Sequence, residues 1–153
     1  MDTNLLADPS LPSRQVRLLL VDDSPVERMA LGHFLRRAGY SVDEVEDGRS
    51  ALTYLQNREI DLLLLDLQMP GMSGFDVLSY LQKHRRGLPV VLLSGMPVDQ
   101  IQLNMHGLPT QELPTLFLKP VDLDQLMQVL ELQLTGQFPD LRSASDSKSV
   151  GSS

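Results

Sequence analysis

Hydrophobic residues along the central part of the chain follow two different spacings. Five short segments are apolar, or alternate apolar with polar positions, as strands do: residues 16–21, 40–45, 60–66, 90–94 and 115–118. Between them, apolar residues recur every three or four positions, which is typical of amphipathic helices. Because strands as apolar as "LLLLD" are covered on both faces, this pattern predicts a parallel sheet with helices on each side.

The helical segments carry recognisable start and stop residues. The five expected helices cover residues 27–39, 47–58, 74–85, 97–107 and 122–134. Ser73 and Asp122 can cap the third and fifth helices, and Pro97 suits the start of the fourth. Gly39 and Gly107 suit helix ends. With short connections and right-handed crossovers, the chain is expected to form an α/β, doubly wound, flavodoxin-like fold whose five parallel strands have the order 2-1-3-4-5.

The length of the chain fits one domain between two tails. A chain of 153 residues with 42% hydrophobic residues can bury one core and is too short for two ordinary domains. We expect the domain at residues 14–135. Residues 1–13 have little periodicity, and residues 136–153 are rich in serine and glycine, so both are expected to be flexible tails. A single-domain protein is therefore predicted.

Composition narrows the classes of function. The chain has no cysteine, which excludes disulfides and thiolate metal sites and fits a cytoplasmic location. No apolar stretch approaches the ~20 residues that span a bilayer, so no membrane association is expected. The net charge is −7 and no basic stripe is present, which argues against nucleic-acid binding.

Side chains with useful chemistry follow the carboxyl ends of the predicted strands, where doubly wound sheets bind ligands. Asp22 and Asp23 follow the first strand, and Asp66 ends the third. Ser94 ends the fourth strand, and Lys119 follows the fifth. Each of them alone could be a helix cap or a solvated side chain. Together they predict three carboxylates, a hydroxyl and an ammonium at one edge of the sheet.

Three neighbouring carboxylates repel one another unless a cation joins them. Mg²⁺ prefers oxygen ligands and keeps several waters. Asp23, Asp66 and the backbone carbonyl of Gln68 would suit it, with Asp22 acting through a water molecule. The predicted cofactor is therefore Mg²⁺, with a coordination position left for a phosphoryl oxygen.

The same residues can carry out phosphoryl transfer. A carboxylate such as Asp66 can attack a phosphoryl group and form an aspartyl phosphate. Ser94 and Lys119 can each hold one phosphoryl oxygen, so the reaction would depend on positioning and charge neutralisation. Asp66 is therefore the predicted phosphoacceptor.

Four stretches together resemble the receiver domain of the two-component response-regulator family: "LLLVDDSPVER", "LLLLDLQMPGMSGFDVL", "VVLLSG" and "FLKP". The resemblance covers roughly residues 15–134. It implies that a histidine kinase, a phosphotransfer protein or a small phosphodonor phosphorylates Asp66. It places Asp22 and Asp23 at the family's acidic metal positions, Ser94 at its switch hydroxyl and Lys119 at its lysine. Such a protein catalyses only its own phosphorylation and dephosphorylation, and it signals to a downstream protein target.

The chain departs from the family pattern in two places. The family usually has an aromatic residue three positions before its lysine, and this chain has Leu116 there. Phe117 is one place off and should point to the opposite face of the sheet. The link over residues 104–115 is also longer than usual and contains Pro109 and Pro114.

Three other functions share parts of this pattern. A flavodoxin-like redox protein needs a loop that binds the FMN phosphate after the first strand, and the carboxylates of "VDDSP" would repel it. A phosphatase of the haloacid-dehalogenase type needs a D-x-D spacing that this loop lacks. A receiver-like adaptor that works without phosphorylation remains the main alternative, although all five site residues are present.

A row of apolar residues predicts a docking surface. At 100° per residue, Val129 and Leu132 fall on the far side of the last helix from its leucine-rich face. Leu103 points outward on the fourth helix, and Leu116 lies on the strand between. We predict that a partner or a second copy of the chain covers these four residues, because the resemblance implies a surface of helix 4, strand 5 and helix 5. The competing interpretation is that they are ordinary exposed apolar residues.

Overall fold

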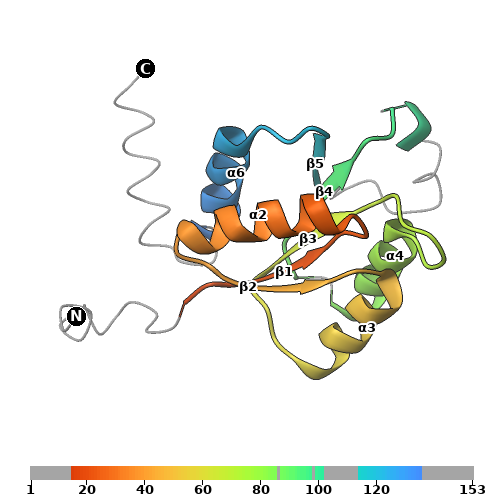
Figure 1. Cartoon of the computed structure of the whole chain (residues 1–153). Coiled ribbons are helices and arrows are strands. Elements are labelled where there is room, and N and C mark those ends of the chain that lie inside the picture. The colour runs from red at the N-terminus through yellow and green to blue at the C-terminus, as the bar shows by residue number, and fades with distance from the viewer. Residues whose placement is uncertain (1–14, 86, 98, 102–113, 136–153) are drawn as a thin grey trace, which may run out of the picture.

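The computed structural model describes residues 15–85, 87–97, 99–101 and 114–135. They form a five-stranded parallel sheet in the order β2-β1-β3-β4-β5 (Figure 1). The strands are β1 (Arg17–Val21), β2 (Ser41–Val45), β3 (Leu62–Asp66), β4 (Val90–Ser94) and β5 (Thr115–Leu118). The predicted doubly wound, flavodoxin-like sheet and its strand order are confirmed. The strands begin one or two residues later than the apolar runs at β1, β2 and β3.

Four helices are described from start to end, and each begins where a side chain can satisfy its first amide groups. They are α2 (Pro25–Arg37), α3 (Gly48–Asn57), α4 (Gly74–His84) and α6 (Leu123–Thr135). Ser73 caps α4 in a capping box with Asp76, and the Asp122 carboxylate accepts a hydrogen bond from the Gln125 amide at 3.1 Å. α2 begins two residues earlier than predicted, because Ser24 serves as its cap and Pro25 fits its first turn.

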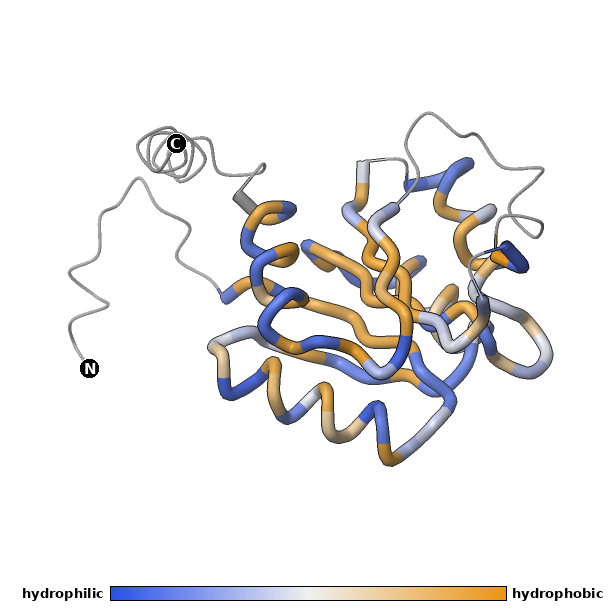
Figure 2. Tube along the Cα trace, turned by 90° about the horizontal axis from the view of Figure 1, so that it is seen from above, coloured by the Kyte–Doolittle hydropathy of each residue, from blue (hydrophilic) through white to orange (hydrophobic). Residues whose placement is uncertain are grey.

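The core consists of two layers, one on each face of the sheet. Helices α3 and α4 lie on one face of the sheet, and α2 and α6 lie on the other (Figure 1). Side chains alternate along the strands, so Leu63 and Leu65 pack in the layer of α3 and α4, whereas Leu62 and Leu64 pack in the layer of α2 and α6. Figure 2 shows the hydrophobic positions gathered along the central strands, with hydrophilic positions on the outer turns of the helices. This arrangement explains why the third strand carries a continuous apolar run.

Two glycines shape the segment between β3 and α4, which follows Asp66. Gly71 adopts a positive φ of 73°, which disfavours other residues. A Cβ at Gly74 would lie 2.4 Å from the carbonyl oxygen of Asp66 and 2.7 Å from the Cα of Leu67. The first turn of α4 therefore packs directly against the backbone at the end of β3, which fixes the position of Asp66.

Several expectations fall outside the described residues. They concern the two tails, residues 1–13 and 136–153, most of the 104–115 link, and Leu103. Of the predicted fourth helix, residues 99–101 are helical and Ile101 is buried in the core. Among the described helices, none is long and apolar enough to cross a membrane.

Candidate active site

Asp66 is a buried carboxylate at the carboxyl end of the central strand β3. Asp66 as a whole residue is 2% exposed to solvent. Its Oδ1 accepts a hydrogen bond from the Gln68 amide at 2.9 Å, and its Oδ2 lies 3.2 Å from the Lys119 Nζ. Burial raises the pKa of Asp66 to about 6, because the Gln68 amide and the Lys119 charge only partly offset the loss of water, and the Asp22 charge adds to the rise. Asp66 is thus still mostly ionised above neutral pH.

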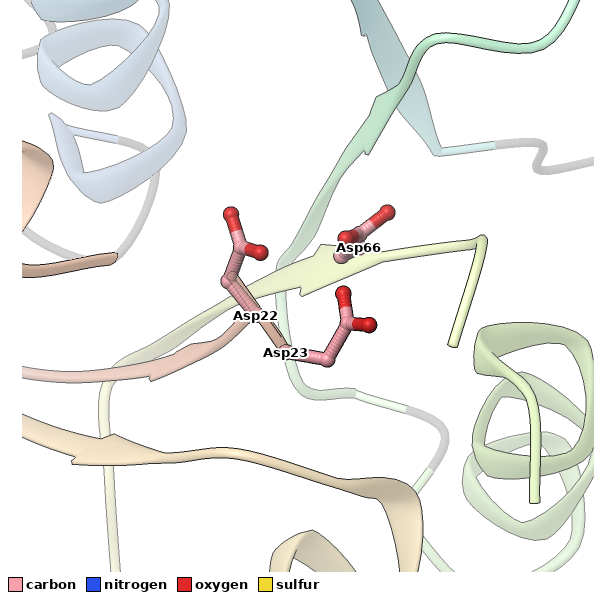
Figure 3. A group of neighbouring side chains, drawn as sticks. All are labelled: Asp22, Asp23 and Asp66. Atoms are coloured by element: carbon pink, nitrogen blue, oxygen red, sulfur yellow. The ribbon is translucent and has the colours of Figure 1, made fainter. Parts of the chain in front are cut away.

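Three carboxylates converge at the ends of two neighbouring strands. Asp22 and Asp23 lie on the turn after β1 and Asp66 at the tip of β3, with the Asp23 carboxylate turned toward Asp66 (Figure 3). One oxygen from each lies within 4.8 Å of the others. Asp22 and Asp66 are buried and Asp23 is exposed. This donor set suits a hard divalent cation. The exposed Asp23 leaves the cluster open to solvent on one side.

Lys119 supplies the positive charge of the site. Its Nζ lies 3.2 Å from Asp66 Oδ2, 3.3 Å from Asp22 Oδ2 and 2.7 Å from Glu27 Oε1. Burial lowers the pKa of Lys119, but the hydrogen bond to Glu27 and the charges of Asp66 and Asp22 outweigh burial and raise it overall. Lys119 is therefore a permanent cation that partly neutralises the buried carboxylates.

Ser94 and Gln68 line the same edge of the sheet. Ser94 is buried at the end of β4, one residue beyond the pairing partner of Asp66. Its hydroxyl oxygen accepts a hydrogen bond from the Met96 amide at 2.8 Å, and its carbonyl oxygen accepts one from the Lys119 amide at 2.7 Å. The Gln68 Oε1 accepts a hydrogen bond from the Gly95 amide at 3.0 Å. These bonds tie together the loops after β3, β4 and β5. The ligand role of the Gln68 carbonyl stays a prediction.

Glu27 belongs to this cluster, and sequence reasoning missed it. It lies in the first turn of α2, and among the described residues its ion pair with Lys119 is shorter than those of Asp22 and Asp66. The stretch "DDSPVER" could have indicated that Glu27 lies near the site, because the helix predicted after Asp23 begins at residue 27, at the same edge of the sheet. The sequence pattern could not predict that the Lys119 side chain extends far enough to contact that helix.

Arg28 is a second residue that sequence reasoning missed. Its Nη1 donates a hydrogen bond to the carbonyl oxygen of Asp22 at 2.8 Å. Its Nε lies 3.3 Å from Glu44 Oε1 on β2, and Arg36 Nη1 lies 2.9 Å from Glu44 Oε2. Arg28 and Glu44 are mostly buried. They therefore hold the backbone of the turn that carries Asp22 and Asp23.

The predicted docking surface is described in part. Leu132 is 65% exposed, as expected. Leu116 is half-buried against the α3 and α4 layer, and Phe117 is buried in the opposite layer, as strand alternation required. The placement of Val129 on the far side of the helix is corrected, because it packs partly against the α2 and α6 layer. At roughly 120° from the centre of the apolar face, Val129 lies at the border of that face.

Comparison with known proteins identifies the family. The profile of the response regulator receiver domain matches residues 18–131, and the chain belongs to this family of two-component signalling domains. The chain is 38% identical over 86 residues to the gliding motility regulatory protein of Myxococcus xanthus, which covers 55% of this chain and 11% of that protein. It is 34% identical over 128 residues to the transcriptional regulatory protein GlrR of Escherichia coli, which covers 82% of this chain and 28% of that protein.

A solved structure shows the same fold. The response regulator TrrA of Thermotoga maritima, in complex with Mg²⁺-BeF, is 28% identical with a TM-score of 0.69, and the match covers 78% of this chain and 99% of that one. The match thus includes nearly the whole of that response regulator. This chain spans only a small part of the two regulators named above, so the prediction of a single-domain protein stays a prediction.

Proposed function

We propose that this receiver accepts a phosphoryl group on Asp66, from the phosphohistidine of a histidine kinase or phosphotransfer protein or from a small phosphodonor, in the presence of Mg²⁺. The observation that carries the proposal is the convergence of Asp22, Asp23 and Asp66 within 4.8 Å, with the Lys119 ammonium 3.2 Å from Asp66. Lys119 pairs with two of these carboxylates but leaves an excess of negative charge, which is costly to bury and which a divalent cation would offset. A response regulator of the same fold, TrrA, was solved in complex with Mg²⁺-BeF, which supports the use of Mg²⁺ in this proposal.

The residues divide the work of the reaction. A carboxylate oxygen of Asp66 attacks the phosphorus, the phosphorus–nitrogen bond of the donor breaks, and the electron pair stays on the imidazole. The products are an aspartyl phosphate and a free histidine. Lys119 and Ser94 each hold a phosphoryl oxygen, and the Gln68 amide keeps Asp66 in place. Bound Mg²⁺, held by Asp23, Asp66 and the Gln68 carbonyl with Asp22 beyond a water, would neutralise phosphoryl charge.

The output in this proposal is contact with proteins. We propose a cognate kinase or phosphotransfer protein, a downstream protein target, and a second copy of the chain on the surface formed by residues 97–107, β5 and α6. The chain acts as a phosphoacceptor and catalyses only its own phosphorylation and dephosphorylation. A cytoplasmic location, without nucleic-acid or membrane contact, belongs to the same proposal. The alternative is a receiver-like adaptor that works without phosphorylation, and the presence of all five site residues argues against it.

Phosphorylation by acetyl phosphate separates the two functions. The full chain is incubated with acetyl phosphate and Mg²⁺ and then separated on a gel that retards phosphoproteins. We expect a retarded band for the wild type, its loss in Asp66→Asn and in buffer with EDTA, and its persistence in Asp124→Asn. Asp124 is a matched control, because it is an exposed aspartate in the first turn of α6. A retarded Asp66→Asn band, or none for the wild type, would refute the proposal.

A further inference from the structure

The Lys119 ammonium is shared among three carboxylates, and its shortest contact is to Glu27. The Nζ–oxygen distances are 2.7 Å to Glu27, 3.2 Å to Asp66 and 3.3 Å to Asp22. An ammonium has three N–H donors, so protein carboxylates can use all of them before a phosphoryl group arrives. Asp22 and Asp66 are buried, whereas the Glu27 side chain is 55% exposed. Glu27 therefore holds Lys119 from the solvent side.

Glu27 also adds a negative charge beside Lys119, the cation that contacts the two buried carboxylates. Both residues line a cavity of about 250 Å³ between the start of α2 and the segment after β5, together with Asp22 and apolar side chains. Lys119 is the only cation among these lining residues, all of which the structure describes. An incoming phosphoryl group must therefore compete with Glu27 for the same ammonium and also approach a further carboxylate.

We propose that Glu27 is a positioning residue of the phosphoacceptor site that acts through Lys119. By holding the ammonium and adding a charge beside the three aspartates, Glu27 lowers the affinity of the site for a phosphoryl group. Lys119 keeps its place without Glu27, because Asp22 and Asp66 still hold it. Glu27 therefore disfavours small anionic phosphodonors. This inference rests on the proposed phosphorylation of Asp66.

Beryllofluoride, a mimic of the phosphoryl group, tests the inference on the full chain. It is titrated at saturating Mg²⁺ into the wild type and into Glu27→Gln, which removes the charge and keeps the shape. For a half-exposed group we expect the Kd to fall about three- to fivefold. Glu59→Gln is the matched control, because Glu59 is 87% exposed, pairs with Arg85 and precedes β3 at the far edge of the sheet. It should leave the Kd unchanged.

Two further readouts distinguish a charge effect from damage to the site. The affinity for Mg²⁺ alone should stay the same or weaken in Glu27→Gln, because a negative charge is lost. Damage to the site would instead weaken the binding of both Mg²⁺ and beryllofluoride. The gain in beryllofluoride affinity should shrink in about 1 M salt, because the Debye length then falls to roughly 3 Å and salt screens the charge of Glu27. A beryllofluoride affinity that is unchanged or weaker in Glu27→Gln overturns the inference.

A measurement without Mg²⁺ keeps the inference separate from the proposed function. If the wild type binds no beryllofluoride, the proposed phosphorylation fails, but the hold of Glu27 on Lys119 can still be measured. By NMR in Mg²⁺-free buffer, the Nζ protons of Lys119 should exchange with water faster in Glu27→Gln, because the neutral amide oxygen of glutamine accepts a weaker hydrogen bond than a carboxylate oxygen. Equal exchange rates in the two proteins overturn the inference whether or not Asp66 is phosphorylated.

Discussion

Replacing Asp66 with asparagine should stabilise the Mg²⁺-free protein. Asp66 is 2% exposed, and its pKa is raised from 3.8 to about 6. The folded protein therefore binds the carboxyl proton more tightly than the unfolded chain does, and ionised Asp66 opposes folding. The cost develops as the pH rises from about 4 to about 6 and is complete above that window. An asparagine side chain is neutral at every pH and would avoid this cost.

The size of the effect follows from the pKa. A rise from 3.8 to about 6 corresponds to about 3 kcal/mol of unfolding free energy above pH 7. The amide of the introduced asparagine would still offer an oxygen to the Gln68 amide, but its NH₂ group would face the Lys119 ammonium, which reduces the gain. We therefore expect Asp66→Asn to be more stable than the wild type by about 1–3 kcal/mol at pH 8 and by much less at pH 4.

Urea unfolding followed by circular dichroism measures this difference. The full chain is unfolded in EDTA at pH 4 and pH 8, with Asp124→Asn as the exposed control that should change little. Mg²⁺ should then remove most of this difference at pH 8, because a ligand at 100 times its Kd adds about 2.7 kcal/mol to a protein that binds it. An Asp66→Asn variant that is less stable at pH 8 in EDTA, or a difference independent of pH, would show that ionised Asp66 does not oppose folding.

Three further predictions concern the support of the site and its surface. Gly74→Ala should lower the unfolding free energy by more than about 2 kcal/mol and slow phosphorylation, because its Cβ would lie 2.4 Å from the Asp66 carbonyl oxygen; urea unfolding that matches the wild type would contradict this. Arg28→Met should weaken Mg²⁺ binding in calorimetry, because the Asp22 carbonyl loses its hydrogen bond, and an unchanged Kd would show that Arg28 does not position the turn. Leu132→Ser should keep the fold within about 0.5 kcal/mol and reduce self-association or partner binding measured with beryllofluoride bound; undiminished association would make Leu132 ordinary surface.

The periodicity of the sequence was sufficient to predict the strand order and the edge of the sheet that carries the site. Strands buried on both faces leave a continuous apolar run, and parallel strands bring their carboxyl ends to one edge. Asp22, Asp23, Asp66, Ser94 and Lys119 could therefore be placed together from spacing alone. Their chemical roles remain predictions.

The contacts of long side chains could not be predicted in this way. Whether Lys119 reaches Glu27, and whether Arg28 reaches the carbonyl of Asp22, depends on rotamers and on the distance between α2 and β5. The error at Val129 has a related cause, because an ideal helical wheel ignores how far a neighbouring layer extends around the helix. Sequence spacing indicates which elements meet, and packing decides which side chains touch.

The most direct test of the central claim is to locate the phosphoryl group chemically. After incubation of the full chain with acetyl phosphate and Mg²⁺, borohydride reduces an aspartyl phosphate to homoserine, and peptide mass spectrometry locates that residue. Homoserine is expected in place of Asp66 in the wild type and at no position in EDTA. Homoserine at another aspartate, with Asp66 unchanged, would contradict the central claim.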